Sequence, residues 1–523
     1  MADDYLSLRQ PVYAKNVVAT SQPLASMAGA RMLLNGGNAV DAALAAAITL
    51  TVVEPTSNGI GSDAFAILWD GSSLKGLNAS GRSPAGWTPE RFANREEMPT
   101  RGWDAVTVPG AVSAWVELST NHGKLPFKEL FQPAIAYARD GYPVSPVIAE
   151  GWQRAAAVLK NEPGFAETFT PAPKAGETFR CEAMAKTLET IAETHGEAFY
   201  RGELAERILA FSDQCGGTMS KQDLAEHTAD WVEPLNLPWF GYQIHEIPPN
   251  GQGIAALIAL GILEQVGIDR CESPDDPESL HLQIEAMKLA FADLHEYISD
   301  PACMAMPPSS FLEPAYLKER AKQIDRNRAG SPPPGVPPKS GTVYLTAADA
   351  SGMMVSYIQS NYMGFGSGIV VPGTGISLQN RGCGFRSKPG HANSVGPRKR
   401  PFHTIIPGFA TKNSQPVMSF GVMGGAMQAQ GHLQMALRVL LYGQNPQQAS
   451  DAPRWQVMEG GWVAVEGAMP PSTVEALRAK GLEIRVEPGW ANPSFGGAQL
   501  ILRCGDGYVA GSEQRKDGLA IGF

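Results

Sequence analysis

Apolar residues recur at three- and four-residue intervals near the start of the chain, which is the spacing of helices with one buried face. Ser21 is a suitable N-cap for the first of these helices. The Asn-Gly-Gly run at 35–37 would end it, since glycine readily adopts the left-handed conformation at a helix C-terminus. Asn38 and Asp41 have the spacing of a capping-box variant and predict a second, alanine-rich helix through about Leu50.

Strand-like and helical segments follow. The runs 65–69 and 74–79 flank an Asp-Gly pair at 70–71 and predict a β-hairpin. Farther along, apolar residues at helical spacing predict an amphipathic helix over 279–299. This apolar stripe is typical of ordinary core packing and does not indicate a cofactor site.

A break in composition separates this helical region from the remainder of the chain. Residues 326–341 contain five prolines and three glycines, which support neither a helix nor a central strand. Immediately afterwards, 342–348 and 353–359 have the pattern of two strands joined by a turn. This feature alone permits two interpretations: a linker before a β-rich domain, or a linker that is cut to free a new amino terminus at Thr342.

The composition indicates a folded protein. Of the 523 residues, 43% are hydrophobic and 18% are charged, so the chain can bury a large core and shows no signature of disorder. Its length is compatible with three or four domains, or with one large domain of intertwined segments. The net charge of -10 argues against a nucleic-acid-binding protein, and we interpret the single basic run at 398–400 as a solvated loop.

The predicted location rests on several negative observations. The acidic N-terminal residues lack the layout of a secretory signal, and the most apolar stretch, 42–53, is far shorter than the ~20 residues of a membrane helix. Six cysteines without a Cys-x-x-Cys pair fit neither a zinc site nor a disulfide framework. We therefore predict a cytoplasmic protein that binds neither membranes nor nucleic acid.

No common catalytic or nucleotide-binding motif is present. The sequence contains no Gly-x-Ser-x-Gly elbow, no His-Glu-x-x-His motif and no glycine-rich loop followed by Lys-Ser/Thr. We therefore expect no metal and no cofactor. His403 and His432 lie near glycine-rich segments, but each alone is typical of a structural histidine.

A threonine at a newly formed amino terminus offers another route to catalysis. Its hydroxyl is a weak nucleophile, and its own α-amine, with an unperturbed pKa near ~8, can act as the base. The tetrahedral oxyanion then needs preorganised N–H donors, each typically worth about 3–4 kcal/mol. A Gly-Gly turn can supply such donors, because no side chain blocks the approach to its backbone.

Several ordered segments resemble signatures of the γ-glutamyltranspeptidase family of N-terminal-nucleophile hydrolases. They span nearly the whole chain and comprise 36–43, 53–61, 342–349, 366–370, 372–376 and the pair Gly424-Gly425. The chain is similar to a divergent member of this family, of the glutathione-hydrolase-like, cephalosporin-acylase-like or oxamate-amidohydrolase-like branch.

The resemblance implies an α+β fold, namely a four-layer αββα sandwich of the N-terminal-nucleophile hydrolase type. It implies self-cleavage between Gly341 and Thr342 into a large fragment, 1–341, and a small fragment, 342–523. The small fragment would hold 523 − 341 = 182 residues, and both fragments would intertwine in one core as an αβ heterodimer. The sequence leaves open whether two such αβ units associate.

The resemblance also implies roles for individual residues. Thr342 matches the nucleophile, and Gly424 and Gly425 match the pair of residues that forms the oxyanion hole. Ser360 matches a second hydroxyl that assists the nucleophile. The substrate would be a small-molecule amide. The predicted substrate-binding residues are Arg82, Tyr362, Arg381, His403 and Thr404.

The substrate pocket departs from the family pattern at two places. Ser80 matches the arginine that holds a substrate α-carboxylate in γ-glutamyl enzymes, with Arg82 two residues on. The segment 378–385, where the family keeps an acidic residue for the substrate α-amine, has no carboxylate and contains Arg381. These changes favour an acyl group with a carboxylate and no neighbouring ammonium. An internal ion pair of Arg381 is an open alternative.

Three functions are therefore compared. The first is a self-processing γ-glutamyltransferase or glutathione hydrolase that cleaves an amide by acyl transfer. The second is an amidase or acylase for amides of glutaryl- or oxamate-like acyl groups that carry a carboxylate. The third is an uncleaved, inactive homologue that acts as a binding or structural protein. The sequence does not give the balance between transfer and hydrolysis.

Overall fold

Two seven-stranded antiparallel sheets form the centre of the molecule. The computed structural model describes residues 9–330, 341–489 and 492–523. The sheet that we call the β10 sheet has the order β21 (Leu519–Gly522), β2 (Val17–Thr20), β10 (Gly341–Ala348), β11 (Met354–Tyr362), β3 (Asp63–Trp69), β4 (Leu74–Asn78) and β7 (Asp230–Val232). The sheet that we call the β15 sheet has the order β1 (Val12–Ala14), β20 (Gly507–Ser512), β19 (Gly497–Cys504), β15 (Gln415–Met423), β14 (Gly408–Lys412), β9 (Tyr242–Glu246) and β8 (Leu235–Trp239).

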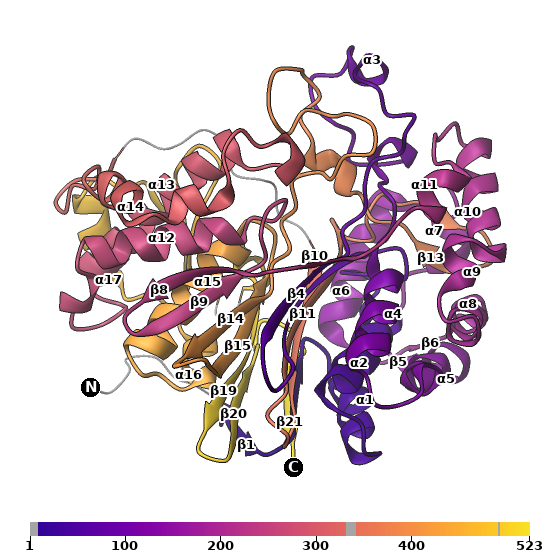
Figure 1. Cartoon of the computed structure of the whole chain (residues 1–523), viewed down its shortest axis with the longest axis horizontal. Helices are drawn as coiled ribbons and strands as arrows, with labels where there is room; N and C mark the ends of the chain where they lie inside the picture. The colour runs from indigo at the N-terminus through magenta and orange to yellow at the C-terminus, as the bar shows by residue number, and fades with distance from the viewer. Residues whose placement is uncertain (1–8, 331–340, 490–491) are drawn as a thin grey trace.

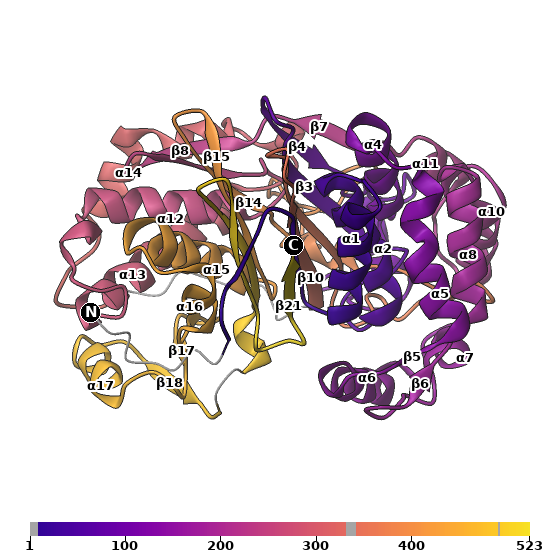
Figure 2. The same ribbon diagram turned by 90° about the horizontal axis from the view of Figure 1, so that it is seen from below.

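Helices cover the outer face of each sheet (Figures 1 and 2). Those on the β10 sheet are α1 (Pro23–Leu34), α2 (Ala39–Val53) and α4 (Ala111–His122). Those on the β15 sheet are α12 (Gly253–Gln265), α15 (Met427–Ala436) and α16 (Pro446–Asp451). Farther out lie α5 (Gln132–Asp140), α6 (Pro146–Leu159), α8 (Glu182–Glu193), α10 (Glu203–Gln214), α13 (Pro277–Tyr297), α14 (Pro314–Ala321) and α17 (Pro471–Ala479).

Shorter elements complete the periphery. The short helices are α3 (Pro89–Phe92), α7 (Phe165–Phe169), α9 (Glu197–Tyr200) and α11 (Lys221–Ala225). The short strands are β5 (Tyr142–Pro143), β6 (Thr178–Phe179), β12 (Val370–Val371), β13 (Ile376–Ser377), β16 (Trp455–Val457), β17 (Val463–Glu466) and β18 (Ile484–Glu487). Among the described residues, no helix is long and apolar enough to cross a membrane.

Strand β10 shows why the sheets are buried on both faces. Val343, Leu345 and Ala347 point to the α2 side and join its apolar core. Tyr344 and Ala348 point the other way and join a separate core between the two sheets. Successive residues of a strand face opposite sides, so a strand that is apolar on both must lie inside a layered core. The predicted four-layer αββα sandwich is confirmed.

Segments from before and after residue 341 are interleaved in both sheets. Strands β10 and β11 lie between β2 and β3. In the other sheet, β14 pairs with β9 on one side and β15 on the other. Neither segment therefore contains a complete seven-stranded sheet of its own.

Most predicted elements are confirmed, with shifted bounds. The predicted hairpin is β3 and β4, and the predicted helix over 279–299 is α13. The capping box of Asn38 and Asp41 is present, and α2 continues to Val53. Residues 331–340 of the predicted linker lie outside the described residues.

The predicted N-cap of the first helix is wrong. Gln22 caps α1, because its side-chain oxygen accepts hydrogen bonds from the amides of Leu24 at 2.6 Å and Ala25 at 3.3 Å. The Ser21 hydroxyl instead donates to the buried carboxylate of Glu54 at 2.6 Å.

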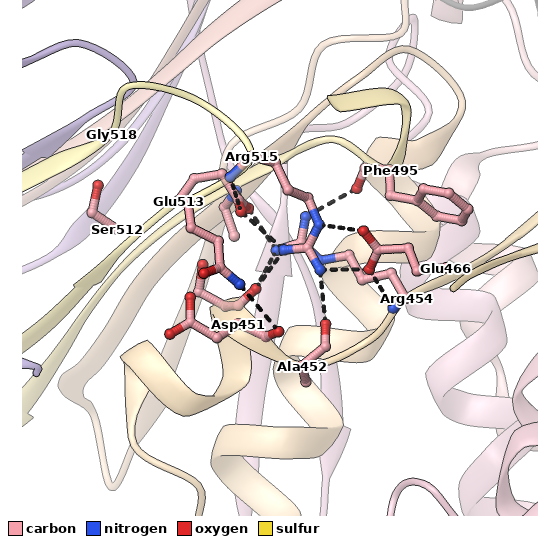
Figure 3. A network of polar contacts seen from close by, with 12 residues as sticks. Asp451, Ala452, Arg454, Glu466, Phe495, Ser512, Glu513, Arg515 and Gly518 are labelled. Atoms are coloured by element: carbon pink, nitrogen blue, oxygen red, sulfur yellow. Dashed lines mark hydrogen bonds and ion pairs between the residues drawn. The ribbon is translucent and has the colours of Figure 1, made fainter. Parts of the chain in front are cut away.

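A buried ionic network fastens the last strands of the chain (Figure 3). The Arg515 guanidinium donates to Glu466 Oε1 at 2.8 Å and to Glu513 Oε1 at 2.9 Å. Arg454 donates to the other oxygen of Glu513 at 2.7 Å and to the Phe495 carbonyl at 2.9 Å. Burial alone would raise the pKa of Glu513, but the two guanidinium groups lower it to about 2. Glu513 is therefore ionised near neutral pH.

Replacing Glu513 by Gln should strongly destabilise the protein, because two buried guanidinium groups would lose their shared carboxylate. Breaking a buried ion pair from one side costs about 3–5 kcal/mol. Thermal unfolding followed by circular dichroism would show this as a lowered melting temperature. The matched control is Glu475→Gln, since Glu475 pairs with Arg478 on the surface at 2.8 Å and such pairs contribute little. Equal melting temperatures for the two variants would contradict this role of the network.

Candidate active site

Thr342 is the second residue of β10, and its side chain is buried. Its Oγ1 lies 3.1 Å from Oγ of Ser360 on the neighbouring strand β11. Ser360 Oγ accepts a hydrogen bond from the Tyr362 amide at 2.8 Å and donates one to the Gly341 carbonyl at 2.9 Å. Because Ser360 has one hydroxyl proton, Thr342 must be the donor in their mutual contact. Ser360 thus holds the Thr342 hydroxyl next to the carbonyl of the preceding peptide bond.

Contacts between the sheets fix how β10 faces β15. Thr346 Oγ1 lies 2.6 Å from Ser419 Oγ. The ring of Tyr344 packs on Gly421, where an added Cβ would lie 2.4 Å from the ring. Moving two residues back along β10 therefore corresponds to moving two residues forward along β15.

The same register brings a glycine pair to the start of β10. One further step of two residues places Thr342 opposite Met423, the last residue of β15. Gly424 and Gly425 follow directly, with φ angles of 123° and 63° that favour glycine. Among the described residues, neither of their amides donates a hydrogen bond to a protein acceptor. An oxyanion hole requires N–H donors of this kind, so the assignment of Gly424 and Gly425 to the oxyanion hole stays a prediction.

Gln252 ties this turn to a second loop. Its Nε2 donates to the carbonyl of Gly425 at 2.7 Å and to the carbonyl of Thr404 at 2.5 Å. Its backbone amide donates to the carbonyl of His403 at 3.0 Å. The glycine turn and the loop that carries Thr404 are therefore held at a fixed separation.

A cavity of about 550 Å³ opens at this place. Three of the predicted substrate-binding residues, Tyr362, Arg381 and Thr404, line it. Tyr362 also bonds to Ser360 through its amide, so one wall residue links the cavity to the Thr342–Ser360 contact, although neither hydroxyl-bearing residue is among the described residues that line it. Other lining residues are Glu96, Glu97, Met98, Leu294, Ile298, Phe385, Arg386, Lys388 and Phe402.

Arg381 presents free donors in this cavity. Its side chain is 1% exposed, and its Nη1 donates to Thr404 Oγ1 at 2.8 Å. Its Cζ lies 4.6 Å from the ring centroid of Tyr362, a residue with a φ of 77°. The Nε and Nη2 groups of Arg381 have no hydrogen-bond partner among the described residues. Buried polar groups are nearly always paired, so these two donors indicate a place for a ligand acceptor.

A buried carboxylate–imidazole pair accompanies the guanidinium. Asp63 is the first residue of β3, and its Oδ2 lies 3.1 Å from His403 Nε2. Its Oδ1 accepts hydrogen bonds from the amides of Gly81 at 3.2 Å and Gly110 at 3.0 Å. Both side chains of the pair are fully buried. His403 thus contacts Asp63 and does not line the cavity.

Burial and mutual charge set the protonation of these groups. Burial raises the pKa of Asp63 to about 7, although the nearby charge of Arg381 opposes this shift. Burial lowers the pKa of His403 well below its usual value, and the charges of Arg381 and Arg400 lower it further. Burial also lowers the pKa of Arg381 to about 10, with Asp63 acting in the opposite direction. Near neutral pH, Arg381 is charged and His403 is neutral.

Arg82 and the basic run occupy other places. Arg82 has a 46% exposed side chain, lies 3.4 Å from an Asp300 oxygen, and lines a separate cavity of about 280 Å³. Among the described residues, no recorded contact places Arg82 beside Arg381.

Arg400 is 7% exposed and donates to Asp230 at 2.6 Å. The interpretation of the whole run as a solvated loop is therefore wrong, because this residue is part of the interior.

Sequence reasoning missed Asp63 and Gln252. The signal for Asp63 was available, since a carboxylate opens an otherwise apolar strand and buried carboxylates are rare unless paired. Gln252 gave no such signal, because it acts on carbonyl groups more than 150 residues away in sequence.

Comparison with known proteins extends this picture. A sequence model of the gamma-glutamyltranspeptidase family matches residues 25–523. A glutathione hydrolase-like proenzyme of Bacillus subtilis is 36% identical, over 97% of this chain and 98% of that protein. An oxamate amidohydrolase proenzyme of Klebsiella pneumoniae is 35% identical, over 96% of this chain and 97% of that protein.

Solved structures agree with the sequence matches. The crystal structure of cephalosporin acylase from Bacillus halodurans superposes with a TM-score of 0.94 and 48% identity, over 100% of this chain and 98% of that chain. The match of fold and sequence is continuous through both sheets and the site. The chain therefore belongs to the gamma-glutamyltranspeptidase family and is a self-processing hydrolase of the N-terminal-nucleophile type.

Proposed function

We propose that Thr342 is both the processing residue and the catalytic nucleophile. In the uncut chain its hydroxyl adjoins the Gly341 carbonyl, and the Ser360 hydroxyl donates to that carbonyl oxygen. Attack of Thr342 Oγ1 on the Gly341 carbonyl carbon would transfer the acyl chain from nitrogen to oxygen. The peptide C–N bond would break in this shift, which frees the α-amine of Thr342. Water would then hydrolyse the ester, which releases the Gly341 carboxylate and restores the Thr342 hydroxyl.

After the cut, the same groups would carry out amide hydrolysis. The freed α-amine takes the hydroxyl proton while Thr342 Oγ1 attacks the substrate carbonyl. The amides of Gly424 and Gly425 stabilise the oxyanion. The amine half of the substrate leaves with a proton, and water or an acceptor amine releases the acyl group. Ser360 keeps the nucleophile oriented throughout.

The acyl group of the substrate carries a carboxylate at the end remote from the amide. The observation that supports this proposal is the Arg381 guanidinium, which has two free donors in the cavity wall. Thr404 and Tyr362 hold it there. A guanidinium matches the planar geometry of a carboxylate. Oxamate, named for the relative in Klebsiella pneumoniae, also has an acyl group with a carboxylate, although there the carboxylate is bonded directly to the amide carbonyl.

Hydrolysis of γ-glutamyl amides is the second candidate, because a glutathione hydrolase-like relative is 36% identical. Such a substrate adds an ammonium group beside its carboxylate. Of the described residues, only Glu96 and Glu97 bring carboxylates to the cavity wall, and Glu96 lies 3.3 Å from Lys388. The surroundings of Arg381 therefore suit a bare carboxylate better.

The assembly and location follow the same reasoning. The interleaved strands favour an αβ heterodimer made from one precursor. The six cysteines are free thiols, which supports a reducing, cytoplasmic location. Transfer to an acceptor amine in place of water remains a prediction.

Replacing Thr342 by Ala should leave the precursor uncut and without activity, because the attacking oxygen is removed. A denaturing gel should show one band near 55.8 kDa in place of two fragments. The matched control is Thr342→Ser, which keeps the hydroxyl and should still be cut. Two fragments from the Ala variant would contradict the assignment.

Replacing Arg381 by Gln should lower kcat/KM for glutaryl-p-nitroanilide by about 10- to 100-fold, the value of a hydrogen bond to a charged group. Activity on pentanoyl-p-nitroanilide, which lacks the carboxylate, should change far less. The control is Arg82→Gln, since Arg82 lines the other cavity. A larger loss with Arg82→Gln than with Arg381→Gln would assign the carboxylate to Arg82.

The wild-type enzyme should also hydrolyse glutaryl-p-nitroanilide faster than γ-glutamyl-p-nitroanilide. The two compounds differ by one α-amino group, whose positive charge would lie near Arg381 without a paired carboxylate. Steady-state rates at equal substrate concentration provide the comparison. The reverse order would favour the glutathione-hydrolase reading.

A further inference from the structure

The Asp63–His403 pair is buried next to the ligand-binding guanidinium but does not line the cavity. His403 Nδ1 accepts a hydrogen bond from the Ile405 amide at 3.4 Å, so its Nε2 carries the proton and donates to Asp63. Both carboxylate oxygens of Asp63 contact protein donors. Because the Asp63–His403 pair does not line the cavity, it can act on a bound substrate only through its charge.

The Asp63 charge matters because it balances Arg381. Each is the strongest opposite charge acting on the other. Asp63 makes its side-chain contact with His403, which leaves the free donors of Arg381 available. When Asp63 is ionised, the two charges cancel. A second carboxylate bound to Arg381 would leave this buried cluster with one uncompensated negative charge.

The other titratable groups around the cluster do not change charge near neutral pH. Burial raises the pKa of the Tyr362 phenol beside Arg381 and that of the Tyr200 phenol near Asp63. Burial raises the pKa of the Cys383 thiol to about 12. Arg400 stays charged and paired with Asp230. Among the groups that act on Asp63 or Arg381, and apart from the α-amine that cleavage would free at Thr342, the Asp63–His403 pair is the one poised to titrate. His295 and His391 also line the cavity, and the Asp63→Asn variant, which leaves both unchanged, distinguishes them from the pair.

We propose that binding of a substrate carboxylate to Arg381 is coupled to uptake of one proton by the Asp63–His403 pair. The ligand carboxylate replaces Asp63 as the counter-ion of Arg381, and a proton from solvent neutralises the pair. Asp63 and His403 titrate as a unit, and on binding no covalent bond changes apart from this proton transfer. The inference rests on the proposed role of Arg381. It makes Asp63 a positioning residue that sets the charge of the pocket.

The sign of the pH dependence follows from linkage. A second negative charge close to Asp63 raises its pKa above the value of the free enzyme. Between these two pKa values the complex holds more protons than the free enzyme, so carboxylate binding weakens as pH rises. Full coupling to one proton corresponds to about a tenfold rise in Kd per pH unit.

The test is calorimetric titration of the mature enzyme with butanoate at pH 8, in two buffers of different ionisation enthalpy. Butanoate offers one carboxylate to Arg381 and brings no second charge to Thr342. We expect uptake of about half to one proton per ligand, and a Kd that rises between pH 7.5 and 8.5. Butanamide, which is neutral, should bind without proton uptake. Butanoate binding without uptake would overturn the coupling and leave the proposed function intact.

Absence of butanoate binding at every pH would overturn both the coupling and the proposed role of Arg381. The Asp63→Asn variant shows whether the Asp63–His403 pair or the Thr342 α-amine takes up the proton. In this variant the amine is unchanged, and binding should become independent of pH and free of uptake. Uptake that persists would assign the proton to the amine and refute the inference.

A second variant keeps the test decisive if Asp63→Asn does not fold. His403→Leu removes the imidazole donor but keeps the Asp63 carboxylate, so the pKa of Asp63 should rise. The pH midpoint of proton uptake should then move upward. An unchanged midpoint would show that the pair does not hold the proton.

Discussion

The packing of Tyr344 on Gly421 is the constraint on which the site depends, because it fixes how the two sheets face each other. Any side chain at Gly421 would occupy the space of the ring, with an added Cβ only 2.4 Å from it. The nucleophile candidate lies two residues before Tyr344, and the glycine turn begins three residues after Gly421. A change in the spacing of the sheets would separate Thr342 from the proposed oxyanion donors, Gly424 and Gly425, without altering either residue.

The molecule uses buried arginines in two different ways. Arg454 and Arg515 have carboxylate partners at hydrogen-bond distance in Glu513 and Glu466, and their network holds strands together. Arg381 is equally buried, but its compensating charge comes from Asp63 without a direct hydrogen bond. The nearby charge of Asp63 reduces the cost of burying the Arg381 guanidinium. The hydrogen-bond donors that Asp63 does not occupy remain able to bind a ligand. Of the three, Arg381 lines the cavity of about 550 Å³.

The sequence predicted the fold through its motifs and the local elements through their periodicity. The β3–β4 hairpin, α2 with its capping box and α13 all depend on contacts within one stretch of chain, so the local sequence pattern predicts them. The register between β10 and β15 could not be predicted, because it depends on side chains such as Tyr344 that contact the opposite sheet. The cap of α1 was missed by one residue, since Ser21 is engaged by Glu54, more than thirty residues away.

The sequence predicts those parts of the site in which one residue by its own chemistry indicates a role. Arg381 was identified because it stands where a carboxylate was expected, and Tyr362 and Thr404 were found to line the same cavity. Arg82 was proposed from its nearness in sequence to Ser80, yet its side chain lies in another cavity. Asp63 could have been suspected from its strand, but its effect on Arg381 required knowledge of which charges share one buried region.

The position of the proposed cut explains how a severed chain can keep an ordered nucleophile. From Val343 onward, β10 pairs with β11, and from Leu345 it also pairs with β2. A new amino terminus at Thr342 would therefore stay next to Ser360, since the following residues are held by backbone hydrogen bonds in the middle of a sheet. On the other side of the proposed cut, Gly341 pairs with Tyr362 as the first residue of β10. The proposed cut therefore lies inside β10, between its first and second residues, so the sheet that positions the uncut hydroxyl would also position the new amino terminus.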